Sequence, residues 1–207
     1  MLKYVLYSVV ALAVLAVVVV GFHLYRVSVR NAEEMAQYSG GNVAVNNRFG
    51  KTLVVYYSLS GRTRDIAERI QAKTGADIYE IKTAEEIKAG YSLYFTSRSN
   101  LKNGIYPELK GNMPDMDGYD VVFVGSPVWW YTVATPAMAF LEEIDFKGRK
   151  VVPFSTQGSN AGTFLEDFTK MAKNANMTDY RSFNNMGKEY DKAVDNKISV
   201  WLNGLAP

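Results

Sequence analysis

An apolar stretch without a single charged residue dominates the start of the chain, running from Tyr4 to Phe22. A helix rises about 1.5 Å per residue, so roughly 20 apolar residues cross a bilayer. The stretch meets that length. We therefore predict that residues 1–25 form a single transmembrane anchor.

Two other interpretations of this stretch are a cleaved signal peptide and a helix buried in a soluble protein. A signal peptide has an apolar region of about 7–15 residues followed by a small-x-small cleavage site. The stretch here is longer, and the sequence after it, GFHLYR (21–26), offers no such site. Lys3 precedes the stretch and Arg26 and Arg30 follow it, which favours a cytoplasmic location for the rest of the chain if the N-terminal amine is blocked.

Residues 26–50 are predicted to be a linker. The segments SGGN (39–42) and NN (46–47) have the composition of turns and tethers. Residues 31–37 could extend a short helix from the membrane.

From residue 51 the pattern alternates between strand-like and helix-like segments. The stretches 121–125 and 151–155 are continuous apolar runs, as parallel strands covered on both faces require. Residues 83–118 are weakly periodic and predict a helix followed by an irregular segment. Such alternation indicates an α/β fold with a parallel sheet. The predicted strands are 52–57, 76–81, 121–125 and 151–155, and the predicted helices are 62–73, 134–142, 162–173 and 188–204.

Pro153 complicates the last of these strands, because proline has no backbone N–H to donate to a ladder. We expect it near a strand end or on an edge strand.

Composition removes many classes of function. The chain has no cysteine, which excludes disulfides, iron–sulfur clusters and thiol catalysis. Its one histidine, His23, lies at the edge of the apolar stretch, so residues 51–207 hold no histidine base or metal ligand. Those residues carry 19 basic and 19 acidic side chains, and a domain without net charge is a poor nucleic-acid binder.

Ligands of open parallel sheets bind beyond the carboxyl ends of the strands, so we expect the binding residues in the segments that follow the strands. After the first strand, small hydroxyl residues and one glycine precede a helix, as in a phosphate cradle at a helix N-terminus. A plain turn with a helix cap has the same composition. The lysine of nucleotide-hydrolysing loops is missing. The candidate residues are Ser58, Leu59, Ser60, Gly61, Arg62 and Thr63.

Three adjacent aromatic residues follow the strand at 121–125. Loops stay at the surface, where an aromatic side chain needs a packing partner or a flat ligand. Coverage of the core or a protein contact would also explain them. The candidate residues are Pro127, Val128, Trp129, Trp130 and Tyr131.

The segment after the strand at 151–155 contains glycines and amides that could line the edge of a ring. Taken alone, it is also compatible with an ordinary loop. Its candidate residues are Thr156, Gln157 and Gly158. A phosphate cradle, an aromatic segment and a glycine-rich segment after strands of one sheet together fit a ligand with a phosphate tail and a planar ring.

The sequence resembles the flavodoxin-like family over about residues 51–204. The phosphate loop [ST]-x-[ST]-G-x-[ST] of that family matches residues 58–63. The bacterial branch with a Gly-x-Pro-φ-Trp-Trp segment matches residues 125–130. Its apolar-Pro-Phe-x-Thr stretch is matched at 152–156, and a C-terminal Trp-Leu is matched at 201–202.

This resemblance implies a five-stranded parallel sheet of order 2-1-3-4-5 with helices on both faces and FMN at its carboxyl edge. It implies a flavodoxin-like, FMN-binding domain at residues 51–207. The expected function is a membrane-anchored redox protein that carries electrons between protein partners. An NAD(P)H-dependent quinone reductase and a flavin-free interaction module are the alternatives, and no residue is assigned a catalytic role.

The segments around the expected flavin contain two charged residues, Arg62 and Arg64, whereas many flavodoxins that carry electrons are strongly acidic. Negative charge near a flavin opposes its reduction, and that repulsion should be weaker here. We expect a less negative reduction potential than in an acidic flavodoxin.

Overall fold

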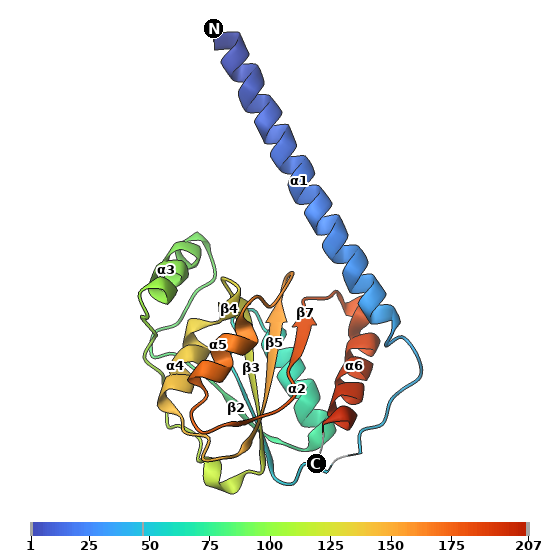
Figure 1. Cartoon of the computed structure of the whole chain (residues 1–207), viewed down its shortest axis with the longest axis vertical. Coiled ribbons are helices and arrows are strands. Elements are labelled where there is room, and N and C mark those ends of the chain that lie inside the picture. Colours follow the sequence, from blue (N-terminus) through green and yellow to red (C-terminus); the bar gives the residue numbers. More distant parts are fainter. Residues whose placement is uncertain (1, 47, 206–207) are drawn as a thin grey trace.

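The computed structural model describes residues 2–46 and 48–205 and has an α/β architecture (Figure 1). Residues 1, 47, 206 and 207 of the predicted segments lie outside this part. The helices are α1 (Leu2–Ala36), α2 (Arg62–Thr74), α3 (Tyr91–Lys102), α4 (Thr135–Glu143), α5 (Phe164–Met171) and α6 (Asp191–Gly204), with 3-10 turns at Met116–Gly118 and Lys188–Tyr190. The strands are β1 (Thr52–Tyr56), β2 (Asp77–Glu80), β3 (Val121–Trp129), β4 (Thr132–Val133), β5 (Lys150–Gln157), β6 (Asn176–Met177) and β7 (Arg181–Asn184).

The sheet has the predicted parallel order. Strands β2, β1, β3 and β5 lie side by side, and the fifth position next to β5 is shared by β6 and β7. The short strand β4 is an antiparallel addition that pairs with the end of β3. The predicted α/β fold and its strand order are thus confirmed.

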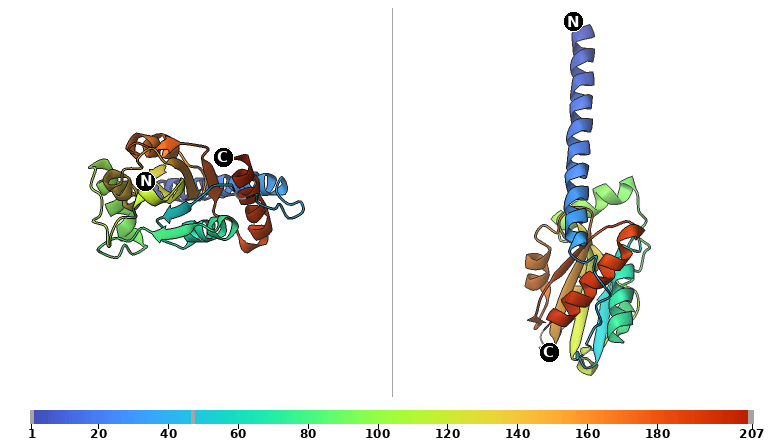
Figure 2. Two further views of the ribbon diagram at one scale, coloured as in Figure 1. Left: turned by 90° about the horizontal axis from the view of Figure 1, so that it is seen from below. Right: turned by 90° about the vertical axis from the view of Figure 1, so that its right-hand side faces the viewer.

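The sheet is covered on both faces, as Figure 2 shows from below. Phe123 of β3 packs in the layer with α2 and α6, whereas its neighbours Val122 and Val124 pack in the layer with α4 and α5. Successive side chains of a strand point to opposite faces, so a continuous apolar run is what two covered faces require.

Pro153 lies inside β5, where it pairs with Val124 of β3. It is neither at a strand end nor on an edge, contrary to the expectation. On the other side of β5, β6 pairs with Lys150 and Val151, and β7 begins its pairing at Phe154. The missing N–H of the proline therefore coincides with the interruption between β6 and β7.

The segment predicted as a linker is only partly irregular, because α1 continues as one helix to Ala36. Its last turns pack against the domain: Met35 is 2% exposed, and Asn31 is also buried. Buried contacts of Asn31 and Met35 with the domain therefore fix the last turns of α1, and the irregular part begins after Ala36.

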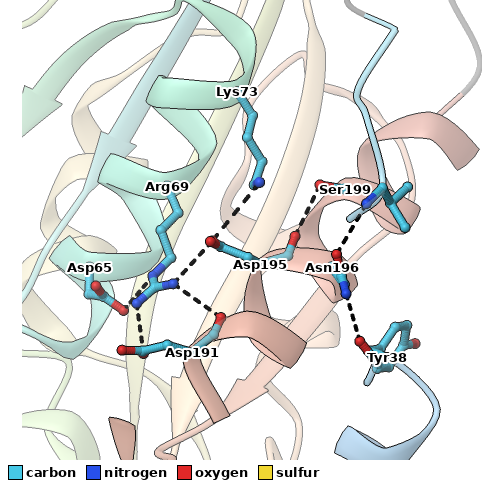
Figure 3. A network of polar contacts seen from close by, with 9 residues as sticks. Tyr38, Asp65, Arg69, Lys73, Asp191, Asp195, Asn196 and Ser199 are labelled. Carbon is cyan, nitrogen blue, oxygen red and sulfur yellow. Dashed lines mark hydrogen bonds and ion pairs between the residues drawn. The ribbon is translucent and has the colours of Figure 1, made fainter. Parts of the chain in front are cut away.

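That irregular part is fastened to α6. The Asn196 side chain donates a hydrogen bond to the Tyr38 carbonyl (2.8 Å) and accepts one from the Val43 amide (3.2 Å), as Figure 3 shows. α6 is in turn fixed to α2, since Arg69 forms ion pairs with Asp191 (2.8 Å) and Asp195 (3.0 Å). The chain that follows α1 is thus held against the domain at Tyr38 and Val43.

Candidate functional site

The carboxyl ends of β1, β3 and β5 meet at one edge of the sheet. Tyr56 of β1 is level with Gly125 of β3, and Gly125 is level with Phe154 of β5. Because the strands are parallel, the segments that follow these three residues lie next to each other. The structure thereby brings the three predicted segments to a common edge.

The first of these segments ends in an open helix N-terminus. Gly61 precedes α2 with φ of +85°, and no side chain caps the helix there. Gly61 is suited to this left-handed conformation, which residues with a Cβ rarely adopt. The first N–H groups of a helix have no partner within it and favour an anion.

A buried hydroxyl lies in the same turn. Among the described residues, the Oγ of Ser58 is enclosed and has no hydrogen-bond partner. Burying a hydroxyl without a partner costs about 1–3 kcal/mol, so such a group points to a ligand that would complete it. The Thr63 hydroxyl is 2.8 Å from that of Thr156, which joins this segment to the end of β5.

The two arginines of this region turn away from the segment. Arg62 donates a hydrogen bond to the carbonyl of Met186 (2.6 Å), and Arg64 pairs with Glu80 of β2. Arg62 and Thr156 line a smaller cavity, of about 180 Å³, beside α6. The remaining predicted hydroxyl, that of Ser60, belongs to an exposed residue.

The aromatic segment is a hairpin rather than a loop. β3 extends to Trp129 and pairs with Thr132 of β4, so the turn consists of Trp130 and Tyr131 alone. Both have positive φ, +53° and +66°. Two-residue hairpin turns of type I′ require this and are usually built from Asn and Gly. Bulky residues held there carry strain of order 1–3 kcal/mol each, which is found mainly at functional sites.

Each aromatic side chain of the hairpin has a different environment. Trp129 packs edge-on against Tyr57, with ring centroids 5.7 Å apart. Trp130 lies 4.4 Å from the Tyr94 ring and donates a hydrogen bond from Nε1 to Ser97 Oγ (3.0 Å). Tyr131 is 62% exposed.

In the third segment, the Gln157 side chain forms hydrogen bonds within the domain. The Gln157 side chain donates to Asn184 Oδ1 (3.1 Å) and accepts from the Ser155 hydroxyl (2.9 Å), so its amide is occupied within the sheet. Asn184 in turn donates to Asn31 of α1 (2.8 Å). Of the three predicted residues of this segment, Gly158 is the exposed one, and it offers only backbone to a ligand.

A cavity of about 520 Å³ lies between these segments. Its volume falls in the range of about 300–1,000 Å³ that is typical of small-molecule and cofactor sites. Of the predicted residues, those that line it are Leu59, Val128, Trp129, Trp130, Tyr131, Gln157 and Gly158. Ser58, Ser60, Gly61, Arg62, Thr63, Pro127 and Thr156 do not line it, and most of them belong to the phosphate segment beside it.

Sequence reasoning missed one wall of this cavity. Gly90, Tyr94 and Ser97, at the start of α3 and within it, line it together with Ser159 and Asn160. The weak periodicity of 83–118 gave no signal for these contacts. α1 also reaches this region, because Arg30 donates a hydrogen bond to the carbonyl of Ser159.

The electrostatics of the cavity are mild. Arg98 lies over the Trp130 ring, 5.2 Å from its centre. Asp167 accepts hydrogen bonds from Thr132 (2.5 Å) and Thr163 (2.6 Å) behind the hairpin. Burial raises the pKa of Tyr57, beneath Trp129, to about 12. Within the described residues, no group of three or more His, Asp or Glu side chains could hold a metal ion.

An uncapped helix N-terminus beside an aromatic cavity lies at the carboxyl edge of a doubly covered parallel sheet, which is where open α/β folds bind their ligands. The sequence profile of the flavodoxin family matches residues 51–203, and the chain belongs to that family.

Individual relatives are more distant. Flavodoxin 1 of Salmonella typhimurium is 27% identical over 107 residues, which are 50% of this chain and 47% of that protein. The chain thus matches about half the length of this curated relative. A flavoprotein from Lactobacillus acidophilus, solved in complex with FMN, superposes with a TM-score of 0.59 at 27% identity, over 64% of this chain and 93% of its own. A Bacteroides eggerthii structure superposes with a TM-score of 0.63 at 28% identity, over 74% and 96% of the two chains.

Proposed function

We propose that this chain is a membrane-anchored redox protein whose flavodoxin domain binds FMN and carries electrons between protein partners. The bound flavin would supply the chemistry, because it takes up and releases electrons one or two at a time. The protein's own residues bind it, orient it and shield it from water.

The observation that carries this proposal is the unpartnered Ser58 hydroxyl beside the uncapped start of α2. A phosphate group there would accept hydrogen bonds from Ser58 and from the free N–H groups of the helix. The cavity lined by Trp129, Trp130 and Tyr131 is next to it, with the size and aromatic lining that suit a flat ring. The complex of the Lactobacillus acidophilus flavoprotein with FMN supports the choice of this cofactor.

The anchor is supported by α1, which is long and apolar enough to cross a membrane and whose apolar stretch is exposed in the structure. We propose a single crossing with the domain on the cytoplasmic side, as the excess of positive charge after the stretch favours. A reporter fused to the C-terminus and active only in the cytoplasm tests the orientation.

A reductase of membrane-dissolved quinones is the second candidate. It is favoured by one relationship in Figure 1: the carboxyl ends of β5 and β7 point toward the end of the domain from which α1 projects. Turnover of NADPH with a quinone by the purified protein distinguishes a reductase from an electron carrier.

The test of the proposal uses the full chain in detergent, titrated with FMN and with riboflavin. Quenching of flavin fluorescence should show tighter binding of FMN, because riboflavin lacks the phosphate. Ser58→Ala should weaken FMN binding about tenfold, by the ~1.4 kcal/mol typical of a hydrogen bond to a charged group, and should leave riboflavin binding unchanged.

Ser99→Ala, at an exposed position of α3, is the matched control and should bind FMN as the unchanged protein does. Protein that binds neither flavin would contradict the proposal and favour a flavin-free interaction module. Equal affinity for FMN and riboflavin would contradict the proposed phosphate site at Ser58 and the start of α2.

A further inference from the structure

One side of α3 is an exposed strip of aromatic and basic residues. Tyr91 is 91% exposed and Phe95 is 70% exposed. Arg98 and Lys102 are also exposed and continue the spacing of three and four residues, so all four share one side of the helix. We call these four residues the outer face of α3.

The side of α3 that adjoins the outer face and carries Tyr94 and Ser97 is fixed to the domain. Tyr94 packs against the Trp130 ring, and the Ser97 hydroxyl accepts the hydrogen bond of the Trp130 indole. The outer face is therefore presented in a defined direction while the inner side closes the aromatic cavity.

The direction of α1 is equally well defined by the contacts of its last turns. Lys197, which is 3% exposed, pairs with Glu34 at 2.5 Å, and Asn31 accepts a hydrogen bond from Asn184. Since α1 is one uninterrupted helix, these contacts orient its apolar stretch relative to the domain. Figures 1 and 2 show α3 on the end of the domain from which α1 projects.

The distance along α1 between the apolar stretch and the domain is short. Phe22 ends that stretch, and Arg30 already contacts the domain, since it donates a hydrogen bond to the Ser159 carbonyl. Eight residues of helix span only about 12 Å. A stalk of this length and stiffness keeps this end of the domain close to the membrane surface.

From these relationships we infer that the outer face of α3 lies in the interfacial layer of the bilayer that α1 crosses, as a second membrane contact. The inference rests on the membrane anchoring proposed above. The chemistry of this face fits, because aromatic rings are enriched at the membrane–water interface and Lys102 is attracted to anionic lipid headgroups. Arg98, at the edge of the face, reaches over the Trp130 ring. The aromatic cavity, which α3 closes, then lies beside the lipid surface.

The absence of cysteine from the chain allows a direct test by site-directed spin labelling. Phe95→Cys and, separately, Tyr91→Cys in the full chain receive a nitroxide label, and the protein is inserted into vesicles that contain phosphatidylglycerol. Oxygen concentrates in lipid, whereas a water-soluble nickel complex stays in the aqueous phase. The ratio of oxygen to nickel accessibility should be several-fold higher at both positions than at the control.

The control is Glu143→Cys. Glu143 is exposed at the end of α4, which runs back from the carboxyl edge of the sheet to its opposite end. Its label should be fully open to the nickel complex. Because Tyr91, Phe95 and Glu143 are all exposed, none of the three changes removes a core contact.

A fourth variant, Val14→Cys, separates failure of the inference from failure of the anchor. A lipid-embedded label at Val14 with nickel-accessible labels at Tyr91 and Phe95 overturns the second contact alone. A nickel-accessible label at Val14 overturns the anchor and the inference with it. Spin–spin broadening at Phe95 would mean that a second copy covers this face and would also overturn the inference.

Discussion

Gly125 of β3 and Phe154 of β5 are register partners, and the ring of Phe154 occupies the space where a side chain of Gly125 would begin. A Cβ on Gly125 would lie 2.0 Å from Cζ of Phe154. Phe154 is fully buried, so its ring has no open space to move into. The glycine that opens the Gly-Ser-Pro-Val-Trp-Trp segment is thus explained by packing between two central strands.

Gly125→Ala should therefore destabilise the domain by about 1–3 kcal/mol, the cost of overpacking a dense core. Urea unfolding of the full chain in detergent, followed by tryptophan fluorescence, measures it. Gly204→Ala in α6 is the control, since a Cβ there meets nothing within 4 Å. Equal unfolding midpoints for the two variants would mean that the Phe154 ring yields more easily than its burial indicates.

The architecture was predictable because strands that are buried on both faces have continuous runs of apolar residues. β1, β3 and β5 are continuous apolar runs, and the helices between them have apolar residues at helical spacing. β7 has one buried residue, Phe183, among polar neighbours, so no pattern marked the fifth position of the sheet. The end of β3 was also not predicted, because the residues that form the hairpin around Trp130 and Tyr131 were expected to be a longer loop.

The candidate site was predictable only where it follows the central strands. Leu59, Trp129 and Gly158 lie there and line the cavity, whereas the wall formed by Tyr94 and Ser97 comes from a helix with little periodicity. The contact of Arg30 with Ser159 joins residues 129 positions apart. No local pattern predicts such a contact, because it depends on the direction in which α1 leaves the domain.

Tyr131→Gly should stabilise the flavin-free protein, by about 1 kcal/mol, because Tyr131 has φ of +66° and glycine adopts this conformation without strain. The Tyr131 carbonyl, which accepts the Thr163 amide at 2.8 Å, is retained. Thermal unfolding of the full chain in detergent measures the change. Asn174→Gly, at another positive φ (+53°) away from the hairpin, is the comparison variant. It also removes the two hydrogen bonds that the Asn174 amide donates to Asp145 (2.9 and 3.1 Å), so it should gain less stability than Tyr131→Gly.

If strain at Tyr131 serves ligand binding, Tyr131→Gly should also weaken FMN binding while Asn174→Gly leaves it unchanged. A variant that is more stable and binds FMN equally well would show that the Tyr131 ring contributes nothing to the site.

Tyr57 gives the domain a dependence on alkaline pH. Burial raises its pKa from 10 to about 12, so between these values the folded state keeps a proton that the unfolded state loses. The free energy of unfolding should therefore fall as pH rises through this window, by at most about 2–3 kcal/mol from this group. Tyr57→Phe, which keeps the ring against Trp129, should make the fall shallower.

Urea unfolding at intervals from pH 9 to pH 12 provides the comparison. Tyr131→Phe is the matched control, because it removes a phenol hydroxyl from a residue that is 62% exposed. Its free energy of unfolding should fall with pH as steeply as that of the unchanged protein. Parallel curves for Tyr57→Phe and the unchanged protein would assign the alkaline loss to other groups.

The charges around the cavity make a prediction for the reduction potential of bound FMN. Arg98 lies over Trp130, and Arg30 contacts Ser159. Two positive side chains therefore adjoin the aromatic cavity, and the sequence did not predict either of them there. Positive charge favours the addition of electrons. At roughly 10 Å and an effective dielectric constant of 40–80, one charge contributes about 0.4–0.8 kcal/mol, or about 20–40 mV per electron.

Arg98→Gln and Arg30→Gln should each shift the potential to more negative values by about that amount, and Asp167→Asn should shift it in the opposite direction. Spectroelectrochemical titration of the full chain at low salt measures all three. Arg48→Gln, which precedes β1 at the opposite edge of the sheet, is the control and should leave the potential unchanged. Because salt screens such charges, the shifts should shrink at 0.5 M salt. Shifts of one sign for all three variants would mean that altered packing, rather than charge, sets the potential.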